Sequence, residues 1–289
     1  MISNCGLNLF ILCYHLFGIK KGGVTMKKLL LLLFMLFSFG LNAGPMFQPP
    51  EELASKGKIT YCATIDNPPR AYADADGNFQ GFEIDLGVEI ANRLGLEAEW
   101  EQMKFDGLIA SVQGQVCDAI VQELFIKPTR VEVIDMVAFG YSAQSIVVNA
   151  NNNSSISGPN DLSGLKVAVP NGTTIHNILM ETNEQLASSG KKAIDIVILE
   201  TTTDSFGQLQ AGQVDAVGTT NTAAAYYVGS SDGKFKFAGS SFGKILDGIG
   251  LNKDRPVLNT AIIAALNSIF VDGTYSNLLK KWNLEGASL

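Results

Sequence analysis

Two places in the sequence have the chemistry to bind an anion. Arg130 carries a guanidinium, a planar fork that matches a carboxylate with two parallel hydrogen bonds. Gly172, Thr173 and Thr174 stand where a helix is expected to begin. Free backbone N–H groups at a helix start attract negative charge, and glycine lets a ligand approach the backbone. Each place also has an ordinary explanation, because most arginines are surface charges and threonine is a common N-cap.

The sequence offers little for acid–base or nucleophilic catalysis. If translation begins at Met26, His176 is the only histidine, and a helix-surface position is its ordinary explanation. No cluster of Cys, His and Asp has the spacing of a metal site, so no metal or other cofactor is expected. Glu123 could be imagined as a general acid or base, but no nucleophile–base pair accompanies it.

The composition fits a folded, acidic protein. The chain has 289 residues, of which 46% are apolar and 17% are charged, and this is enough for one large or two medium domains with real cores. The net charge is −7, and lysines and arginines occur in runs no longer than two. A nucleic-acid partner is therefore not expected, and neither is the basic face that an anionic membrane would attract.

Residues 1–43 are expected to be a leader that is removed. Met26 and two lysines precede an apolar run over 29–41, which has the length of a signal-peptide core and is too short to span a bilayer. Cleavage is expected after Ala43, and no cysteine follows to carry a lipid. A membrane anchor is the less favoured alternative. Met1 could also be the true start, but the signal peptide is complete from Met26.

Two cysteines remain in the mature chain, Cys62 and Cys117. In an oxidising compartment such a pair is a candidate disulfide. The two cysteines fall in strands expected over 59–65 and 117–121, so a bridge is geometrically feasible if these strands are neighbours in a parallel sheet. Two buried free thiols are the alternative, and the bridge is favoured.

Expected strands and helices alternate from residue 58 onward, which predicts parallel sheets with crossover helices. The first set of units includes a helix over 105–113 and ends in a strand over 145–149. A second set follows, and GQVCDAI at 114–120 is echoed there by GQVDAV at 212–217. Two related α/β lobes, followed by a helical C-terminal part, are the favoured interpretation.

The stretch 81–94 has the most informative pattern. It begins as a turn and continues as an amphipathic helix, with apolar residues four apart on one stripe and acidic residues in the first turn. It resembles the signature of the family 3 solute-binding proteins, the periplasmic receptors that deliver polar amino acids to ABC transporters. The resemblance covers about 58–284 and includes further short matches in the same order, at 105–109, 118–120, 128–130, 161–167, 172–174 and 272–282.

The resemblance implies the type II periplasmic binding protein fold. This is an α/β fold of two lobes, each a mostly parallel sheet flanked by helices, joined by two hinge crossings near 145–149 and 237–241. The first lobe would comprise 57–145 and 242–289, and the second 146–241. The protein would be a periplasmic monomer that closes its lobes on a small-molecule ligand and delivers the ligand to an ABC transporter permease.

The resemblance also assigns the carboxylate site. Arg130 corresponds to the residue that binds the carboxylate of the ligand, and Thr173 and Thr174 would grip the same group from the second lobe. Phe105 corresponds to an aromatic that stacks on the ligand, with plain core packing as its alternative.

The near wall of the pocket is expected to be polar. Thr64 and Asn67 lie at positions that line the pocket in relatives. Asn67 and Arg70 both stand where relatives often carry an aromatic residue.

Two departures from the family pattern bear on the ligand. The family has a small residue and a Ser or Thr shortly before the arginine, where this chain has Glu123 and Phe125, with Leu124 between them; all three are expected to line the pocket. The family also places an aspartate after the strand of the second lobe, where it pairs with the α-ammonium of the ligand. This chain has Thr220 there, next to Asn221.

A buried ammonium without a carboxylate is costly. Either Glu123 supplies the missing charge from the first lobe, or the ligand has no ammonium. The first is the favoured hypothesis, and a solvent-facing glutamate is its alternative.

Two other functions fit the same lobes. A few proteins of this fold, such as periplasmic cyclohexadienyl dehydratases, are enzymes, and others are sensory binding proteins that report to a partner. The absence of a nucleophile–base pair favours a binding protein that is not an enzyme.

Overall fold

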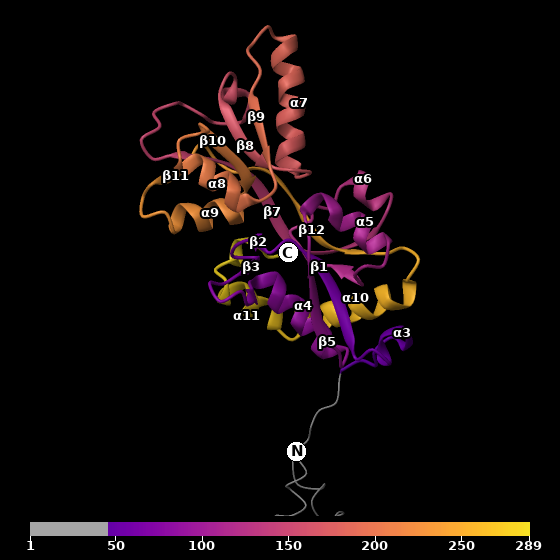
Figure 1. The fold of residues 1–289 in the computed structure, drawn as a ribbon. Helices are drawn as coiled ribbons and strands as arrows, with labels where there is room; N and C mark the ends of the chain where they lie inside the picture. The colour runs from indigo at the N-terminus through magenta and orange to yellow at the C-terminus, as the bar shows by residue number, and fades with distance from the viewer. Residues whose placement is uncertain (1–45) are drawn as a thin grey trace, which may run out of the picture. The chain divides into compact units, whose positions relative to one another are not determined.

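The computed structural model describes residues 46–289, so the predicted leader, with Met26 and Ala43, lies outside the described residues. The described chain is built on one mixed sheet of nine strands and a smaller sheet of three (Figure 1). The large sheet has the order β5 (Glu97–Gln102), β1 (Lys58–Ala63), β6 (Ala119–Ile120), β12 (Phe242–Leu251), β7 (Asp135–Asn149), β10 (Ala216–Thr220), β8 (Lys166–Pro170) and β9 (Asp195–Leu199), with β11 (Phe235–Phe237) paired to β7.

The sheet is parallel at both ends and antiparallel in its middle. Strand β1 pairs in parallel with β5 and β6, and β8 pairs in parallel with β9 and β10. Strands β7 and β12 run antiparallel to each other and connect the two parallel parts. The predicted α/β fold is therefore confirmed, and the antiparallel pairs arise where the chain crosses between the two parts.

The first lobe has its own hydrophobic core around α4 (Phe82–Arg93), α10 (Pro256–Val271) and α11 (Thr274–Lys281). The stripe predicted in 81–94 faces this core, because Phe82, Leu86, Ile90 and Leu94 are all at most 1% exposed. The C-terminal helices, far away in sequence, pack against α4 in the same lobe. The lobe also contains α3 (Glu51–Ala54), η1 (Phe105–Gly107), α5 (Leu108–Gln113), α6 (Pro128–Val131), η3 (Glu285–Ala287) and the small sheet of β2 (Asp66–Asn67), β3 (Ala71–Ala73) and β4 (Phe79–Gln80).

Gly81 is the N-cap of helix α4, and the chain passes very close to itself there. Gly81 has a φ of 129°, and a Cβ at this position would lie 2.1 Å from the carbonyl oxygen of Arg70. That carbonyl accepts a hydrogen bond from the backbone N–H of Glu83. Only glycine fits this turn, which fixes the start of α4 against the loop that carries Arg70.

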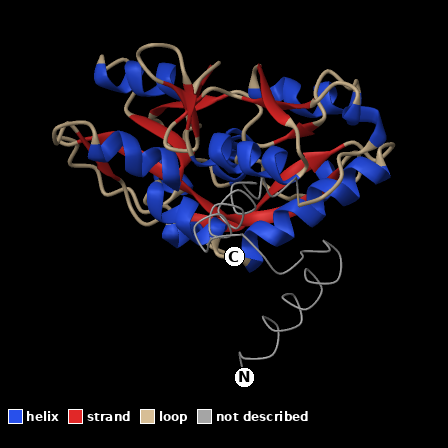
Figure 2. Ribbon diagram, turned by 90° about the horizontal axis from the view of Figure 1, so that it is seen from below, coloured by secondary structure: helices blue, strands red, loops and turns tan. Residues whose placement is uncertain are grey.

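The second lobe contains two smaller apolar clusters on the two sides of β8 and β10. Its helices are η2 (Pro159–Leu162), α7 (Thr174–Ser188), α8 (Thr202–Gln210) and α9 (Asn221–Gly229). In the described chain as a whole, helices lie on both sides of the strands, as Figure 2 shows. The residue boundaries given above for the two lobes stay predictions.

Three expected elements differ from the structure. The strand expected over 117–121 is only β6, Ala119–Ile120, so Cys117 lies just before it. The strand expected over 145–149 is the end of β7, which begins ten residues earlier, at Asp135. Polar residues such as Ser142 and Gln144 hide this strand in the sequence, yet both are buried, and the Ser142 hydroxyl lies within hydrogen-bond distance of the Glu123 and Asp247 carboxylates. The helix expected over 105–113 is a 3₁₀ turn, η1, followed by the short helix α5. Among residues 46–289, no single helix is long and apolar enough to cross a membrane, and α10 and α11 reach that length only together, across a 77° bend.

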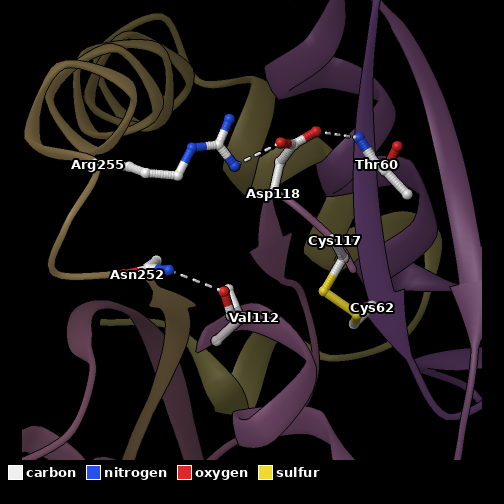
Figure 3. Close-up of a disulfide and its surroundings, with 7 residues drawn as sticks. All are labelled: Thr60, Cys62, Val112, Cys117, Asp118, Asn252 and Arg255. Carbon is white, nitrogen blue, oxygen red and sulfur yellow. Dashed lines mark hydrogen bonds and ion pairs between the residues drawn. A yellow bond between two sulfur atoms is a disulfide. The ribbon is translucent and has the colours of Figure 1, made fainter. Parts of the chain in front are cut away.

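A disulfide joins Cys62 in β1 to Cys117 just before β6, with the two Cα atoms 5.6 Å apart (Figure 3). The parallel pairing of β1 with β6 brings these cysteines together. The adjacent Asp118 accepts hydrogen bonds from the backbone N–H of Thr60 at 2.8 Å and from Arg255 at 2.6 Å. The bridge and this carboxylate together hold β6, which has only two residues, at the centre of the first lobe.

We predict that replacing both Cys62 and Cys117 by alanine lowers the free energy of unfolding by about 2–4 kcal/mol, because the bridge closes a loop of 55 residues in the unfolded chain. Equilibrium unfolding in urea measures the change. Dithiothreitol should destabilise the wild-type protein and leave the double variant unaffected. Equal sensitivity of the two proteins to the reductant would contradict the prediction.

Candidate functional site

A cavity of about 50 Å³ lies between the two lobes. It is lined mainly by polar and aromatic residues from both of them: Thr64, Asp66, Asn67, Phe105, Gln122, Glu123, Phe125, Arg130, Gln144, Pro170, Thr173, Thr174, Ile175, Glu200, Thr202, Thr219 and Thr220. Nine of the residues predicted for the ligand site are among them, namely Thr64, Asn67, Phe105, Glu123, Phe125, Arg130, Thr173, Thr174 and Thr220.

Arg130 is positioned by the short helix α6, which follows β6. Its side chain donates a hydrogen bond to the carbonyl oxygen of Phe125 at 2.9 Å, and its guanidinium lies 5.5 Å from the centre of the Phe105 ring. The residue is 7% exposed, and burial lowers the pKa of its guanidinium to about 10. Both neighbours are uncharged, so the positive charge faces the cavity with no neutralising group.

The other three arginines of residues 46–289 each have a carboxylate partner. Arg70 pairs with Asp247 at 3.0 Å, Arg93 with Asp272 at 2.7 Å, and Arg255 with Asp118 at 2.6 Å. Arg130 alone forms no ion pair within this part of the chain. A buried cation without a partner is strongly disfavoured unless an anion binds it, so the cavity has the properties of a carboxylate site.

The second lobe presents the start of α7 to the same cavity. The Thr173 hydroxyl caps the helix, accepting from the backbone N–H of His176 at 3.4 Å and donating to the carbonyl oxygen of Pro170 at 2.8 Å. The first backbone N–H groups of a helix have no intrahelical acceptor, and here they belong to Thr174 and Ile175, which both line the cavity. The helix start and Arg130 therefore offer donors to one anion from two lobes.

Glu123 is buried, 4% exposed, and accepts hydrogen bonds from both lobes. Its Oε1 accepts from the hydroxyls of Ser142 at 2.5 Å and Thr222 at 2.6 Å. Its Oε2 accepts from Asn67 at 2.9 Å and from the hydroxyl of Thr220 at 2.8 Å. Glu123 is thus not the solvent-facing residue of the alternative interpretation, and it links the first lobe directly to Thr220 and Thr222 of the second.

Arg70 does not form part of the cavity wall, which corrects its predicted place. It is 1% exposed and lies among three carboxylates, at 3.3 Å from Glu83, 3.2 Å from Glu123 and 3.0 Å from Asp247. Burial lowers the pKa of Arg70, but these carboxylates outweigh it and raise that pKa above its ordinary value. The side chain turns inward because these acids, far apart in sequence, converge on it.

One cation cannot neutralise three carboxylates. Burial raises the pKa of Glu83 to about 8, against the lowering effect of Arg70. Burial likewise raises the pKa of Asp247 to about 6, although Arg70 and Ser142 oppose the change. At neutral pH Glu83 is therefore mainly protonated, and the buried cluster of Arg70, Glu83, Glu123 and Asp247 carries less negative charge than its composition suggests.

Two more predicted site residues lie away from the cavity. Leu124 packs into an apolar cluster of the first lobe beside the disulfide, because its side chain faces the opposite way from those of Glu123 and Phe125. Asn221 accepts a hydrogen bond from the backbone N–H of Ala143 at 2.9 Å, so it contacts the crossing strand β7 instead of the cavity.

The sequence predictions did not include several cavity residues, among them Asp66, Gln122, Glu200, Thr202 and Thr219. Most of these follow the carboxyl ends of parallel strands, where ligands bind in open α/β sheets, and that rule could have found them. Asp66 accepts a hydrogen bond from the backbone N–H of Thr202 at 3.0 Å, which adds another bond between the lobes. No group of three or more His, Cys, Asp or Glu residues within 46–289 is placed to hold a metal ion.

The sequence is similar to a family of known binding proteins and to individual members of it. Residues 59–285 match the sequence profile of the bacterial extracellular solute-binding proteins, family 3. The lysine/arginine/ornithine-binding periplasmic protein of Escherichia coli (strain K12) is 32% identical over 265 residues, which cover 89% of this chain and 97% of that protein.

Solved structures give the same picture. A mutant of ArgBP from T. maritima superposes with a TM-score of 0.73 at 29% identity, covering 80% of this chain and 97% of that one. The ancestral amino acid-binding protein AncCDT-1, a precursor of cyclohexadienyl dehydratase, superposes with a TM-score of 0.73 at 28% identity, covering 80% and 98%.

The raised pKa of Glu83 predicts a pH dependence of stability. Between about 4.5, its ordinary pKa, and about 8 in the folded protein, the folded state binds more protons than the unfolded state. The free energy of unfolding therefore falls as the pH rises through this window. We predict that Glu83→Gln, which mimics the protonated form, makes this fall shallower in urea unfolding at pH 5, 6, 7 and 8, leaving the part due to Asp247.

Glu184→Gln is the matched control, because Glu184 is exposed on α7. It should keep the wild-type pH dependence. A Glu83→Gln protein with an unchanged slope would show that Glu83 is ionised when folded.

Proposed function

Because the chain belongs to the bacterial extracellular solute-binding proteins, family 3, we propose that it is a periplasmic receptor for an amino acid or a related small carboxylate. It captures the ligand by closing its two lobes and delivers it to the permease of an ABC transporter. The relatives named above are amino acid-binding proteins, which supports the ligand class.

The observation that carries this proposal is the unpaired guanidinium of Arg130 in a cavity between the lobes. A ligand carboxylate would accept two parallel hydrogen bonds from it and would also meet the free N–H groups at the start of α7. Neither lobe alone supplies both sets of donors. Such a ligand therefore binds the closed form more tightly than the open form.

The two crossing strands provide the hinge for this motion. Strand β7 contributes Phe139 to the core of the first lobe, and Ile146 and Val148 to that of the second, so it belongs to both. Closure by rotation about β7 and β12 moves two intact cores with few internal changes. A micromolar affinity, about −8 kcal/mol, would be enough for capture and release.

The ligand's identity needs a screen. A thermal-shift panel of the amino acids and of small organic acids would find it, since a ligand that binds only the folded protein raises its melting temperature. L-lysine, L-arginine and L-ornithine are the first to test, because the E. coli relative is named for binding lysine, arginine and ornithine.

We predict that Arg130→Met weakens binding of the best ligand of this panel by about thirtyfold or more, because truncating one partner of a buried charge pair costs about 2–5 kcal/mol. Isothermal titration calorimetry measures the change. Arg255→Met is the matched control, because Arg255 is similarly buried (side chain 9% exposed) but contacts Asp118, away from the cavity. It should lower stability and keep the affinity. Wild-type affinity in Arg130→Met would refute the proposed site.

An enzyme of the same fold is the second candidate, favoured by the similarity to a precursor of cyclohexadienyl dehydratase and by a buried acid, Glu123, beside the cavity. We predict that incubation with prephenate or arogenate yields no aromatic product above the rate without protein. Catalytic formation of phenylpyruvate or phenylalanine that disappears in Glu123→Gln would establish the enzyme instead. A sensory receptor would share the lobes and the ligand, and adjacent genes for a permease and an ATPase would favour transport over it.

A further inference from the structure

If the ligand is dipolar, as amino acids are, the cavity needs a negative group for the positively charged nitrogen. Three acids line the cavity: Asp66, Glu123 and Glu200. Their surroundings differ enough to choose among them. The choice rests on the proposed function, because it assumes that the ligand's carboxylate occupies the site at Arg130.

Glu123 has little capacity left for a ligand. A carboxylate offers about four acceptor positions. Asn67, Thr220 and Thr222 donate to three of those of Glu123, and the Ser142 hydroxyl, whose single hydrogen is shared with Asp247 at 2.7 Å, lies at the fourth. Arg70 adds a positive charge 3.2 Å from Oε1. A ligand ammonium at Glu123 would have to displace bonds that join the two lobes.

Glu200 is also compensated. It forms an ion pair with Lys104 at 2.5 Å, and both side chains are about two-thirds exposed, at 67% and 64%. Water already solvates this acid, so a ligand cation gains little from it.

Asp66 has no such compensation. It lies in β2, shortly after the carboxyl end of β1, and its Oδ2 accepts the backbone N–H of Thr202. No lysine, arginine or histidine of the described chain forms an ion pair with it. Burial raises the pKa of Asp66, and hydrogen bonds from Thr64 and Thr202 offset this only in part. The carboxylate is thus half-buried, and no cation of the described chain balances it.

We infer that Asp66 binds the positively charged nitrogen of the ligand, as the acidic counterpart of Arg130 in the same cavity. Within residues 46–289, Arg130 and Asp66 are the charged side chains of the cavity wall that have no ion-pair partner and no full set of protein hydrogen bonds. Their charges have opposite signs, so the site is complementary to a molecule with one anionic and one cationic group. A neutral or purely anionic solute would leave Asp66 uncompensated. Asp66 is therefore a specificity-determining residue, and Glu123 holds the lobes together.

The test compares three probes by isothermal titration calorimetry on wild type and on Asp66→Asn. L-arginine has an α-ammonium and a guanidinium, L-glutamine has only the α-ammonium, and 5-guanidinopentanoate has only the guanidinium. Asparagine keeps an oxygen for the N–H of Thr202 and removes the charge. Asp106→Asn is the matched control, because Asp106 also bonds to the second lobe, through Asn171 at 2.8 Å, but does not line the cavity.

We expect Asp66→Asn to weaken binding of L-arginine by about tenfold or more, a hydrogen bond to a charged group being worth about 1.5–3 kcal/mol. If Asp66→Asn also weakens binding of L-glutamine but not of 5-guanidinopentanoate, Asp66 binds the α-ammonium. If it also weakens binding of 5-guanidinopentanoate but not of L-glutamine, Asp66 binds the side-chain guanidinium. Asp106→Asn should bind all probes as the wild type does.

Wild-type affinities in Asp66→Asn would overturn the inference and leave the receptor proposal intact. A wild-type protein that binds succinate and none of the three probes would likewise overturn it. An Arg130→Met protein with undiminished binding would instead refute the proposed function itself.

Discussion

The burial of Arg130 without a carboxylate partner is the constraint on which the cavity depends. A guanidinium loses most of its hydration when it is 7% exposed, and the carbonyl of Phe125 and the ring of Phe105 return only part of that energy. The described chain places acids beside its other arginines but none beside this one. The first lobe therefore holds a charge that is best satisfied from outside, and the free N–H groups at the start of α7 add donors from the second lobe.

The other buried charges have a different role. Arg70 is surrounded by Glu83, Glu123 and Asp247, so its positive charge is balanced by carboxylates of the protein itself. Through Glu123 this buried cluster reaches the hydroxyls of Thr220 and Thr222 in the second lobe. Polar bonds of the protein itself thus join the lobes beside the cavity, and a ligand adds to them instead of supplying every contact. Removing one member of such a cluster would leave its partners buried and unbalanced.

Periodic and short-range features were predictable from the sequence. The stripe in 81–94 fixed one face of α4, and the alternation of strands and helices indicated the α/β fold, because both follow from local hydrophobic spacing. The inward turn of Arg70 was not predictable, since it depends on acids up to 177 positions away that meet only after folding. Local spacing also hid the first ten residues of β7, among which Ser142 and Gln144 are polar yet buried. Asn221 was assigned to the site for its place beside Thr220, but its side chain accepts a hydrogen bond from the backbone N–H of Ala143 in β7 and does not line the cavity.

The most direct measurement is a crystal structure of the protein with the best ligand of the thermal-shift panel. Two near-parallel hydrogen bonds of about 2.7–2.9 Å from the Arg130 guanidinium to the ligand's carboxylate, with donors from the start of α7 on the same group, are the predicted result. A ligand bound elsewhere, or an Arg130 side chain that points into bulk water, would contradict it.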